Sequence, residues 1–440
     1  MTKNLAYSAV ASGSAVLMLL LLTLAGRWLG VDDYGAFTFA ITIATIAEVF
    51  MDFGLHQVTI RAVARDPSSA ARFLRTSLVL KLLPGVGMIV IVGAAVFWLR
   101  DEPDVRLACL LMLGGAAMRS LLLTAKGILQ GLERFGADAL LTTADRLLLL
   151  IACGLALLNG AGVVMTSLVF LAVRVVTAAA SLWFVTRLVG PGTVDRGLRR
   201  RLPLEALPIG AFLLVLNVYN RVDTVMLGSM SGDRETGLYG AAYPLYEGLT
   251  YAASILSAVL VPRLSRLWAD DASHYGRLAR RALGWSAVMA VVLAALALPL
   301  AEWTIVLAFG AEYREAASTF RILLVALPFI YVLWGLHSVA LSCHHTRALV
   351  LVTAIGTVVN VLLNAAWIPT YGADGAAAAT VISEGLAAAM LGWSLRHALA
   401  GRNDTGSQAP AISPADQDDV AALGRADLAS ARRRADRHAD

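Results

Sequence analysis

The sequence has little charge for its length. Asp, Glu, Lys and Arg make up 15% of its 440 residues, whereas a typical soluble protein carries about 25%. Six Arg and seven Asp lie in residues 401–440, so the first 400 residues are poorer still. So few charges cannot cover the surface of a large soluble domain, and 58% of the residues are hydrophobic. We therefore exclude a soluble enzyme, a secreted disulfide scaffold and a nucleic-acid-binding protein, and predict a polytopic membrane protein.

Cysteine, metal-ligand patterns and nucleotide motifs are also scarce. The three cysteines, Cys109, Cys153 and Cys343, are isolated in or beside apolar runs, without CxxC or Cys/His spacing. They indicate neither a disulfide framework nor a metal site. The sequence contains no GxxxxGK[ST] loop, so we do not expect this chain to hydrolyse nucleotide. The positive net charge of +5 is typical of cytoplasmic loop arginines in a membrane protein.

Long apolar segments fill the first 400 residues. About 20 apolar residues in a helix cross the roughly 30 Å hydrocarbon layer, and twelve segments meet this requirement. An isolated strand in lipid would leave backbone groups without hydrogen bonds, so the predicted fold class is all-α. The predicted transmembrane helices are 8–29, 36–60, 76–99, 107–132, 138–159, 162–186, 204–230, 237–261, 282–309, 316–342, 348–369 and 375–398.

The basic residues of the connecting loops predict the orientation. Alternate loops contain 18 and 5 Lys or Arg residues, and the richer set faces the cytoplasm in membrane proteins. Both termini are therefore predicted to be cytoplasmic. The richer set comprises Lys3, Arg61, Arg65, Arg72, Arg75, Arg134, Arg187, Arg196, Arg199, Arg200, Arg201, Arg263, Arg266, Arg277, Arg280, Arg281, Arg347 and Arg396, and the other set Arg27, Arg100, Arg106, Arg234 and Arg314.

The two halves of the chain echo each other. Tyr34-Gly35-Ala36, shortly after Leu29-Gly30, recurs as Tyr239-Gly240-Ala241 after Leu227-Gly228. Chance recurrence of small residues is the alternative to duplication. Six spans per half predict two six-helix bundles related by a pseudo-twofold axis along the membrane normal, an arrangement typical of alternating-access transporters. The predicted parts are a bundle 1–189, a cytoplasmic basic linker 190–203, a bundle 204–399 and a disordered cytoplasmic tail 400–440.

Four arginines lie near the middle of predicted spans. A charge at mid-membrane costs about 2.5–3.5 kcal/mol on insertion scales, so such a residue usually faces a cavity or an ionic partner. Arginine stays charged and can donate two hydrogen bonds to phosphate or carboxylate oxygens. The set therefore predicts a cavity for an anionic group, and pairing with acids inside the bundles is the alternative. The candidate substrate-binding residues are Arg119, Arg146, Arg174 and Arg221.

Acidic residues also lie inside spans, and we consider them for ion coupling. Glu48 and Asp52 are four residues apart, so they share one helix face. A desolvated carboxylate can exchange a proton near neutral pH or bind sodium; neutralisation of Arg119 or Arg174 is the alternative. The candidates are Glu48, Asp52, Asp223 and Glu384. No cofactor is expected beyond a coupling proton or sodium ion. Lys81, Lys126 and Arg321 lie nearer span ends and are predicted to extend to the membrane interface.

Several segments in order carry a family resemblance. The segments are 26-GRWLGVDDYGAFTFA-40, 52-DFGLHQVTIRAVARD-66, 129-LQGLERF-135, 220-NRVDTVMLG-228, 236-TGLYGAAYPL-245 and 261-VPRLSRL-267. In this order they resemble polysaccharide or oligosaccharide flippases, the Wzx-like, O-antigen-exporter branch of the multidrug/oligosaccharidyl-lipid/polysaccharide exporter superfamily.

The resemblance implies a substrate and a mechanism. It implies ion-driven movement of an undecaprenyl-diphosphate-linked oligosaccharide from the inner to the outer leaflet, with the diphosphate and sugars in a cationic cavity. Membrane lipids are implied partners, glycan polymerases and glycosyltransferases are further candidates, and nucleic acid is not expected. A cation-coupled multidrug exporter and a lipid II flippase are the alternatives within the superfamily. An integral glycosyltransferase is disfavoured, because the predicted outside loops are too short to build a catalytic site.

Overall fold

The computed structural model describes residues 13–400, and within this range it contains helices and no strand. The helices are α2 (Ala15–Leu29), α3 (Val31–Asp52), α4 (Leu55–Arg65), α5 (Ala70–Leu99), α6 (Pro103–Gly131), α7 (Phe135–Leu158), α8 (Val163–Val189), α9 (Arg196–Tyr219), α10 (Val222–Met230), α11 (Gly232–Asp270), α12 (Ala272–Phe309), α13 (Ala316–Ser342), α14 (Thr346–Ser394) and α15 (Arg396–Leu399), with 3₁₀ turns η1 (Pro67–Ser69) and η2 (Ala311–Tyr313).

The helices account for all twelve predicted spans. Ten of those in the described range are long and apolar enough to cross a membrane, and Val16–Leu29 is a shorter apolar helix. The tenth, α14, contains Gly372 in a non-helical conformation (φ 54°), so it comprises two spans joined by a kink. Glu235 of α11 accepts a hydrogen bond from the N–H of Ala373 at 2.8 Å and so caps the helix that resumes there. The predicted all-α, twelve-helix fold class is confirmed.

Two predicted spans differ from the structure because they are broken. The predicted helix 36–60 is divided at Phe53 and Gly54, whose φ angles of 42° and 80° lie in the left-handed region and end α3. The predicted helix 204–230 is divided into α9 and α10 at Asn220 and Arg221. A hydropathy average over about 20 residues detects neither break, because each break lies within a segment that is apolar overall.

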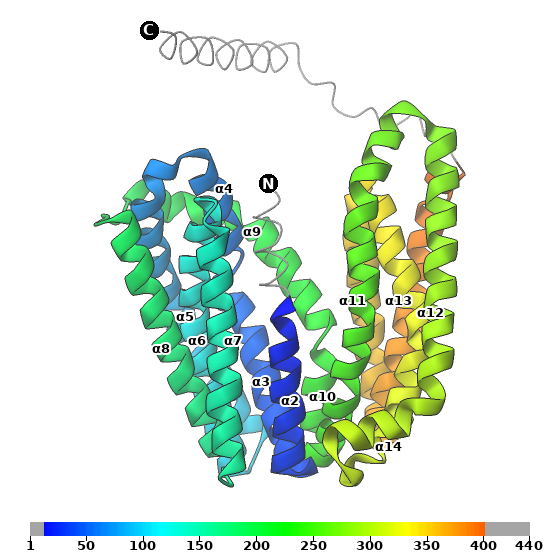
Figure 1. The fold of residues 1–440 in the computed structure, drawn as a ribbon, viewed down its shortest axis with the longest axis horizontal. Coiled ribbons are helices and arrows are strands. Elements are labelled where there is room, and N and C mark those ends of the chain that lie inside the picture. The colour runs from blue at the N-terminus through cyan, green and yellow to red at the C-terminus, as the bar shows by residue number, and fades with distance from the viewer. Residues whose placement is uncertain (1–12, 401–440) are drawn as a thin grey trace.

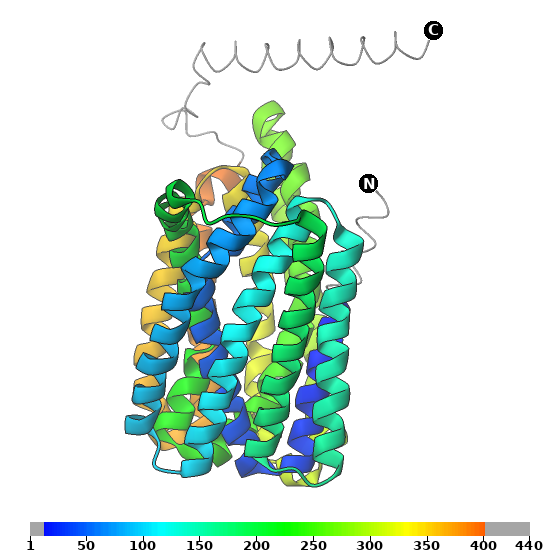
Figure 2. The same ribbon diagram turned by 90° about the vertical axis from the view of Figure 1, so that its left-hand side faces the viewer.

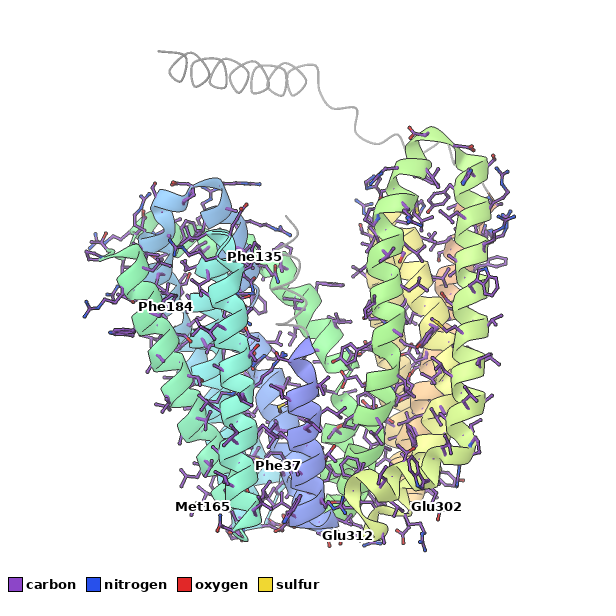
Figure 3. The ribbon with its side chains drawn as sticks, viewed as in Figure 1. Phe37, Phe135, Met165, Phe184, Glu302 and Glu312 are labelled. Carbon is purple, nitrogen blue, oxygen red and sulfur yellow. The ribbon has the colours of Figure 1, made fainter. Side chains whose placement is uncertain are left out.

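The helices form two bundles that meet at one end and diverge toward the other (Figure 1). Helices α2 to α8 pack in the N-terminal bundle and α11 to α14 in the C-terminal one, while α9 crosses between them. Viewed from the side, the helices of the N-terminal bundle run next to one another along the molecule (Figure 2). Met165, Glu302 and Glu312 lie toward the end where the bundles meet, and Phe135 and Phe184 toward the other end (Figure 3).

The structure places part of the predicted linker in a helix, whereas the predicted tail is almost entirely outside the described residues. Helix α9 begins at Arg196, inside the predicted linker 190–203, because the Asp195 side chain accepts hydrogen bonds from the N–H groups of Gly197 and Leu198 at 2.7 and 3.0 Å. The predicted disordered tail lies outside the described residues apart from Ala400. The division into two six-helix domains by residue number, and the cytoplasmic placement of the termini, stay predictions.

The two echoed segments contact each other where the bundles meet. Pro244 has no N–H, so the Gly240 carbonyl of α11 lacks its usual helical partner. Tyr34 of α3 donates a hydrogen bond to that carbonyl at 3.0 Å. Arg100, at the end of α5, donates to the Gly228 carbonyl at 2.9 Å and forms an ion pair with Asp233 at 2.6 Å. These contacts join the bundles at the end that the sequence predicts to be outside the cell.

Candidate functional site: a cavity between the two bundles

A cavity of about 450 Å³ lies between the bundles. Helices α2, α3, α6, α7 and α8 line it from the N-terminal bundle, and α9, α10 and α11 from the other side. The charged residues that line it are the four arginines predicted from depth, Arg119, Arg146, Arg174 and Arg221, together with Glu48 and Glu247. With the buried Asp145 that pairs with Arg174 also counted, the four permanent cations still outnumber the carboxylates at this cavity.

Two of the arginines line the cavity and also pair with acids. The Arg119 Nε atom lies 2.9 Å from Glu48 Oε1. The Arg174 Nη1 atom lies 2.5 Å from Asp145 Oδ2, and the Thr177 hydroxyl donates to the other carboxylate oxygen at 2.8 Å. These ion pairs therefore hold both guanidinium groups in place. The Arg119 side chain is still 32% exposed, whereas that of Arg174 is only 5% exposed. The two alternatives left open by the sequence, pairing and exposure to the cavity, coexist.

The other two arginines have different surroundings: Arg146 lies in the middle of α7 and Arg221 at the break between α9 and α10. Arg146 Nη1 donates a hydrogen bond to the Ser14 hydroxyl at 2.7 Å, which links α7 to the start of α2. Arg221 precedes the first residue of α10, at the break after α9. No ion pair involves Arg221 within residues 13–400. Its position at a helix break leaves its backbone and side chain beside the cavity, on the C-terminal side.

Glu48 and Asp52 share a helix face but pair with different basic residues, Arg119 and Lys81. Asp52 is buried and lies 2.6 Å from the Lys81 ammonium group of α5, which also donates to the Ser120 carbonyl at 2.6 Å. The other oxygen of Asp52 accepts a hydrogen bond from the N–H of His56 at 3.2 Å. Asp52 therefore stabilises the α3–α4 break. Only Glu48, of the four predicted coupling residues, lines the cavity.

The predicted interfacial role of Lys81 is wrong. Its side chain is 1% exposed and is enclosed by the ion pair with Asp52. Lys126 likewise turns inward, to 3.7 Å from Asp138, and its side chain is 16% exposed. Arg321, by contrast, is on the surface beside Glu302. The error has a simple cause: α5 begins at Ala70, about two turns before the predicted start of that span.

A second polar cluster lies inside the C-terminal bundle, beside the cavity. Asp223 accepts hydrogen bonds from the hydroxyls of Tyr239 at 2.6 Å and Thr380 at 3.3 Å. Glu384 is buried one turn after Thr380. Oxygens of Asp223, Asn364 and Glu384 have no hydrogen-bond partner within the described part of the chain. Buried oxygens without donors are suited to a proton or to a small hard cation such as sodium.

This cluster differs from a transition-metal site. Within residues 13–400, no three His, Cys, Asp or Glu side chains are grouped so that they could hold a metal ion. The amides are ordered by side-chain hydrogen bonds: Asn364 donates to Asn360 at 2.9 Å, and Asn360 donates to Ser383 at 3.3 Å. Asp223 and Glu384, predicted separately from the sequence, are thus brought into one cluster by the packing of α10 on α14.

Sequence reasoning missed the aromatic lining. Tyr239 connects Asp223 to the cavity, and Tyr243 and Tyr251 also line the cavity from α11. Their spacing of four and eight residues, with Glu247 between the last two, was visible in the sequence as one helix face. Tyrosines in an apolar helix are, however, also typical of ordinary packing, so depth alone did not single them out.

Comparisons with known proteins agree with this architecture. A model of the family "Polysaccharide biosynthesis protein" matches residues 1–268, and a model of the family "Lipid II flippase MurJ" matches residues 251–412. No curated protein sequence gives a significant match.

Similar solved structures show the same fold. A lipid II flippase MurJ in an inward closed conformation superposes with a TM-score of 0.73 at 16% identity, over 89% of this chain and 87% of that one. An inward-facing multidrug resistance MATE family transporter gives 0.68 at 17% identity, over 89% and 96%. A MOP superfamily transporter from Pyrococcus furiosus gives 0.62 at 15% identity, over 90% and 96%. Because the first family model covers more than half of the sequence, the chain belongs to the polysaccharide biosynthesis protein family, and its fold is that of the MOP superfamily of membrane transporters.

Proposed function

We propose that the protein is a flippase that moves an undecaprenyl-diphosphate-linked oligosaccharide from the inner to the outer leaflet of the bacterial cytoplasmic membrane. The observation that carries the proposal is the positive cavity between the bundles, where four arginines are opposed by two glutamates. Guanidinium groups bind phosphate oxygens with charge-assisted hydrogen bonds. The same charges repel a cationic drug, which disfavours a multidrug exporter. The protein is then a secondary transporter rather than an enzyme.

A lipid II flippase is the second candidate function. Its support is the MurJ family model that matches residues 251–412 and the fold similarity to a solved MurJ. Lipid II also carries a diphosphate and sugars, so the arginines suit both substrates. The two candidate substrates differ in their glycan, so transport of each lipid separately distinguishes the two functions.

Alternating access supplies the movement in this proposal. The bundles are joined at the predicted outer end and diverge at the predicted cytoplasmic end (Figure 1), as expected of an inward-facing state with both termini in the cytoplasm. For the MATE transporters, the TM-score is 0.68 to an inward-facing structure and 0.61 to an outward-facing one. Substrate bound between the bundles would be released outside once the joined end opens.

We expect loss of the cavity arginines to reduce transport. Arg146→Ala and Arg221→Ala should each lower the rate of appearance of lipid-linked glycan in the outer leaflet by about tenfold, because each removes a charged hydrogen-bond donor to phosphate. The rate is measured in cells depleted of the wild-type protein, and in vesicles loaded with the oligosaccharide lipid or with lipid II. Arg119→Ala and Arg174→Ala leave Glu48 or Asp145 unpaired, so these variants are compared with Arg119→Ala/Glu48→Gln and Arg174→Ala/Asp145→Asn.

The control is Arg321→Ala, which removes an arginine on the surface of α13 and should leave the rate unchanged. Full transport in all four single arginine variants, and in a variant that carries all four arginine-to-alanine changes, would refute a cationic binding cavity. Transport of lipid II alone would assign the second candidate function.

Ion coupling is the second part of the proposal. Asp223 and Glu384 are buried and each has an oxygen without a hydrogen-bond partner within the described residues, and Tyr239 links Asp223 to the cavity. We therefore assign to them the binding of a coupling proton or sodium ion. Glu48 and Asp52 remain candidates as well. Phosphate bound to Arg119 would release Glu48 to accept a proton, and Asp52 lies one turn away.

Asp223→Asn and Glu384→Gln should abolish the dependence of transport on the imposed sodium or pH gradient, because an amide neither binds a proton nor supplies charge. The gradient dependence is measured from initial transport rates in vesicles, with and without each gradient. Glu302→Gln, on the surface beside Arg314 and Arg321, is the matched control. An unchanged gradient dependence in both cluster variants would exclude the cluster as the coupling site; the same measurement on Glu48→Gln and Asp52→Asn tests the remaining candidates.

A further inference from the structure

One face of α11 carries an aromatic and acidic stripe toward the cavity. Tyr243, Glu247 and Tyr251 are spaced four residues apart, so they lie on one side of the helix, and all three line the cavity. We call these residues the α11 stripe. Helix α11 forms the edge of the C-terminal bundle that faces the N-terminal bundle (Figure 1). The stripe therefore lies opposite the arginines of α6, α7 and α8.

The stripe is accessible, unlike tyrosines that serve only in packing. Tyr251 is 53% exposed, whereas Tyr275, Tyr313 and Tyr331, away from the cavity, are fully buried. Glu247 is half-buried, and its carboxylate makes no ion pair or side-chain hydrogen bond within residues 13–400. Gly248, one residue further, is exposed, and a Cβ atom there would meet no atom within 4 Å. Open space therefore lies next to the Glu247 carboxylate on the cavity side of α11.

The ring of Tyr243 is held in position. It stacks on Tyr239 with 5.4 Å between ring centroids and an angle of 24° between planes. Its hydroxyl donates to the Asn220 carbonyl at 3.2 Å, at the α9–α10 break. Tyr239 is itself fixed by the bond to Asp223. This ring is thus preorganised to receive a ligand.

Aromatic rings and a carboxylate suit a sugar. The C–H groups on one face of a pyranose carry partial positive charge and pack on the negative face of an aromatic ring, while its hydroxyls donate to carboxylate oxygens. A phosphate would be repelled by Glu247. We propose that the α11 stripe binds a sugar residue of the lipid-linked oligosaccharide while the arginines of the N-terminal bundle bind the diphosphate. The proposal rests on the proposed function and assigns the two parts of the substrate to different bundles.

The test separates the sugar from the diphosphate. Purified protein in nanodiscs is titrated with undecaprenyl diphosphate and with undecaprenyl diphosphate that carries one N-acetylglucosamine. Tyr251→Leu and Glu247→Gln should each weaken binding of the glycosylated lipid by about tenfold, as expected for loss of one aromatic or charged contact, and leave binding of the sugar-free lipid unchanged. Tyr251→Phe keeps the ring and should bind like the wild type.

Arg146→Ala provides the comparison, because loss of a diphosphate contact should weaken binding of both lipids. Equal affinity of the wild type for the two lipids, or equal loss for both lipids in Tyr251→Leu, would overturn the assignment of the sugar to the stripe. Unchanged binding of both lipids in Arg146→Ala would instead count against the proposed function. Melting measured with a thiol-reactive dye confirms that each variant is folded.

Discussion

Asp145→Ala is expected to lower the free energy of unfolding by about 3–5 kcal/mol, because it leaves a buried arginine without its partner. The side chains of Arg174 and Asp145 are 5% and 3% exposed. The guanidinium group also lies over the ring of Phe170, 5.0 Å from its centroid, and its Nε atom has no hydrogen-bond partner within residues 13–400. Asp145 therefore supplies the charge in direct contact that compensates Arg174.

The three cysteines provide a probe of this unfolding. Cys109, Cys153 and Cys343 are buried, so a thiol-reactive fluorescent dye reacts when the detergent-solubilised protein unfolds. The matched control is Glu205→Ala, which breaks the exposed pair with Arg201; exposed pairs contribute about 0–1 kcal/mol. Asp145→Leu/Arg174→Met removes both charges and should recover most of the lost stability. If Asp145→Ala has the same melting temperature as the wild type, the inferred desolvation of Arg174 is contradicted.

The spans were predictable because lipid imposes a simple requirement. Every backbone N–H and C=O group in the hydrocarbon layer needs an internal partner, so apolar length alone identifies helices. The breaks were not predictable. Phe53 and Gly54 end α3 in left-handed conformations, and the ion pair between Asp52 and Lys81 stabilises that break from another helix. Such a contact depends on tertiary packing, which hydropathy does not contain.

The candidate site was predictable in part for a similar reason. A permanent charge at mid-membrane is costly unless it faces a cavity or an ionic partner. Depth in the predicted spans therefore identified the four arginines that line the cavity. Their partners could not be read from spacing, because Glu48 and Arg119 lie 71 residues apart. Depth was misjudged for Lys81, which was predicted to reach the interface but is buried in an ion pair. Eleven residues separate it from the start of α5 at Ala70, so it lies about 16 Å along the helix, too deep to reach the interface.

Gly35→Ala is expected to prevent the bundles from joining at the predicted outer end. A Cβ atom on Gly35 would overlap the backbone carbonyl of Asp233 in the other bundle and lie 2.9 Å from the backbone N of Gly237. Gly237 in turn approaches the Val31 carbonyl. Backbone cannot move aside as a flexible side chain can. Overpacking of this kind costs about 1–3 kcal/mol, which shifts the populations of two states by about 5- to 150-fold.

The bundle that contains Gly35 should itself remain stable. Gly35 lies inside α3 without a positive φ angle, so alanine is tolerated there and favours the helix by about 0.5–1 kcal/mol over glycine. Gly35→Ala therefore separates an effect on closure from an effect on folding. Gly284→Ala, in α12, is the matched control, because its Cβ would meet no atom within 4 Å.

Distances between spin labels at the joined end measure the result. Asn159→Cys in the N-terminal bundle and Glu312→Cys in the C-terminal bundle give exposed labelling sites, while the native cysteines are buried. Gly35→Ala should increase the population with a long distance between the labels and lower transport, because a protein held open at this end cannot return to accept substrate from the cytoplasmic side. Gly284→Ala should leave both unchanged. If Gly35→Ala keeps the short distance, the closed end does not depend on the contact of α3 with α11.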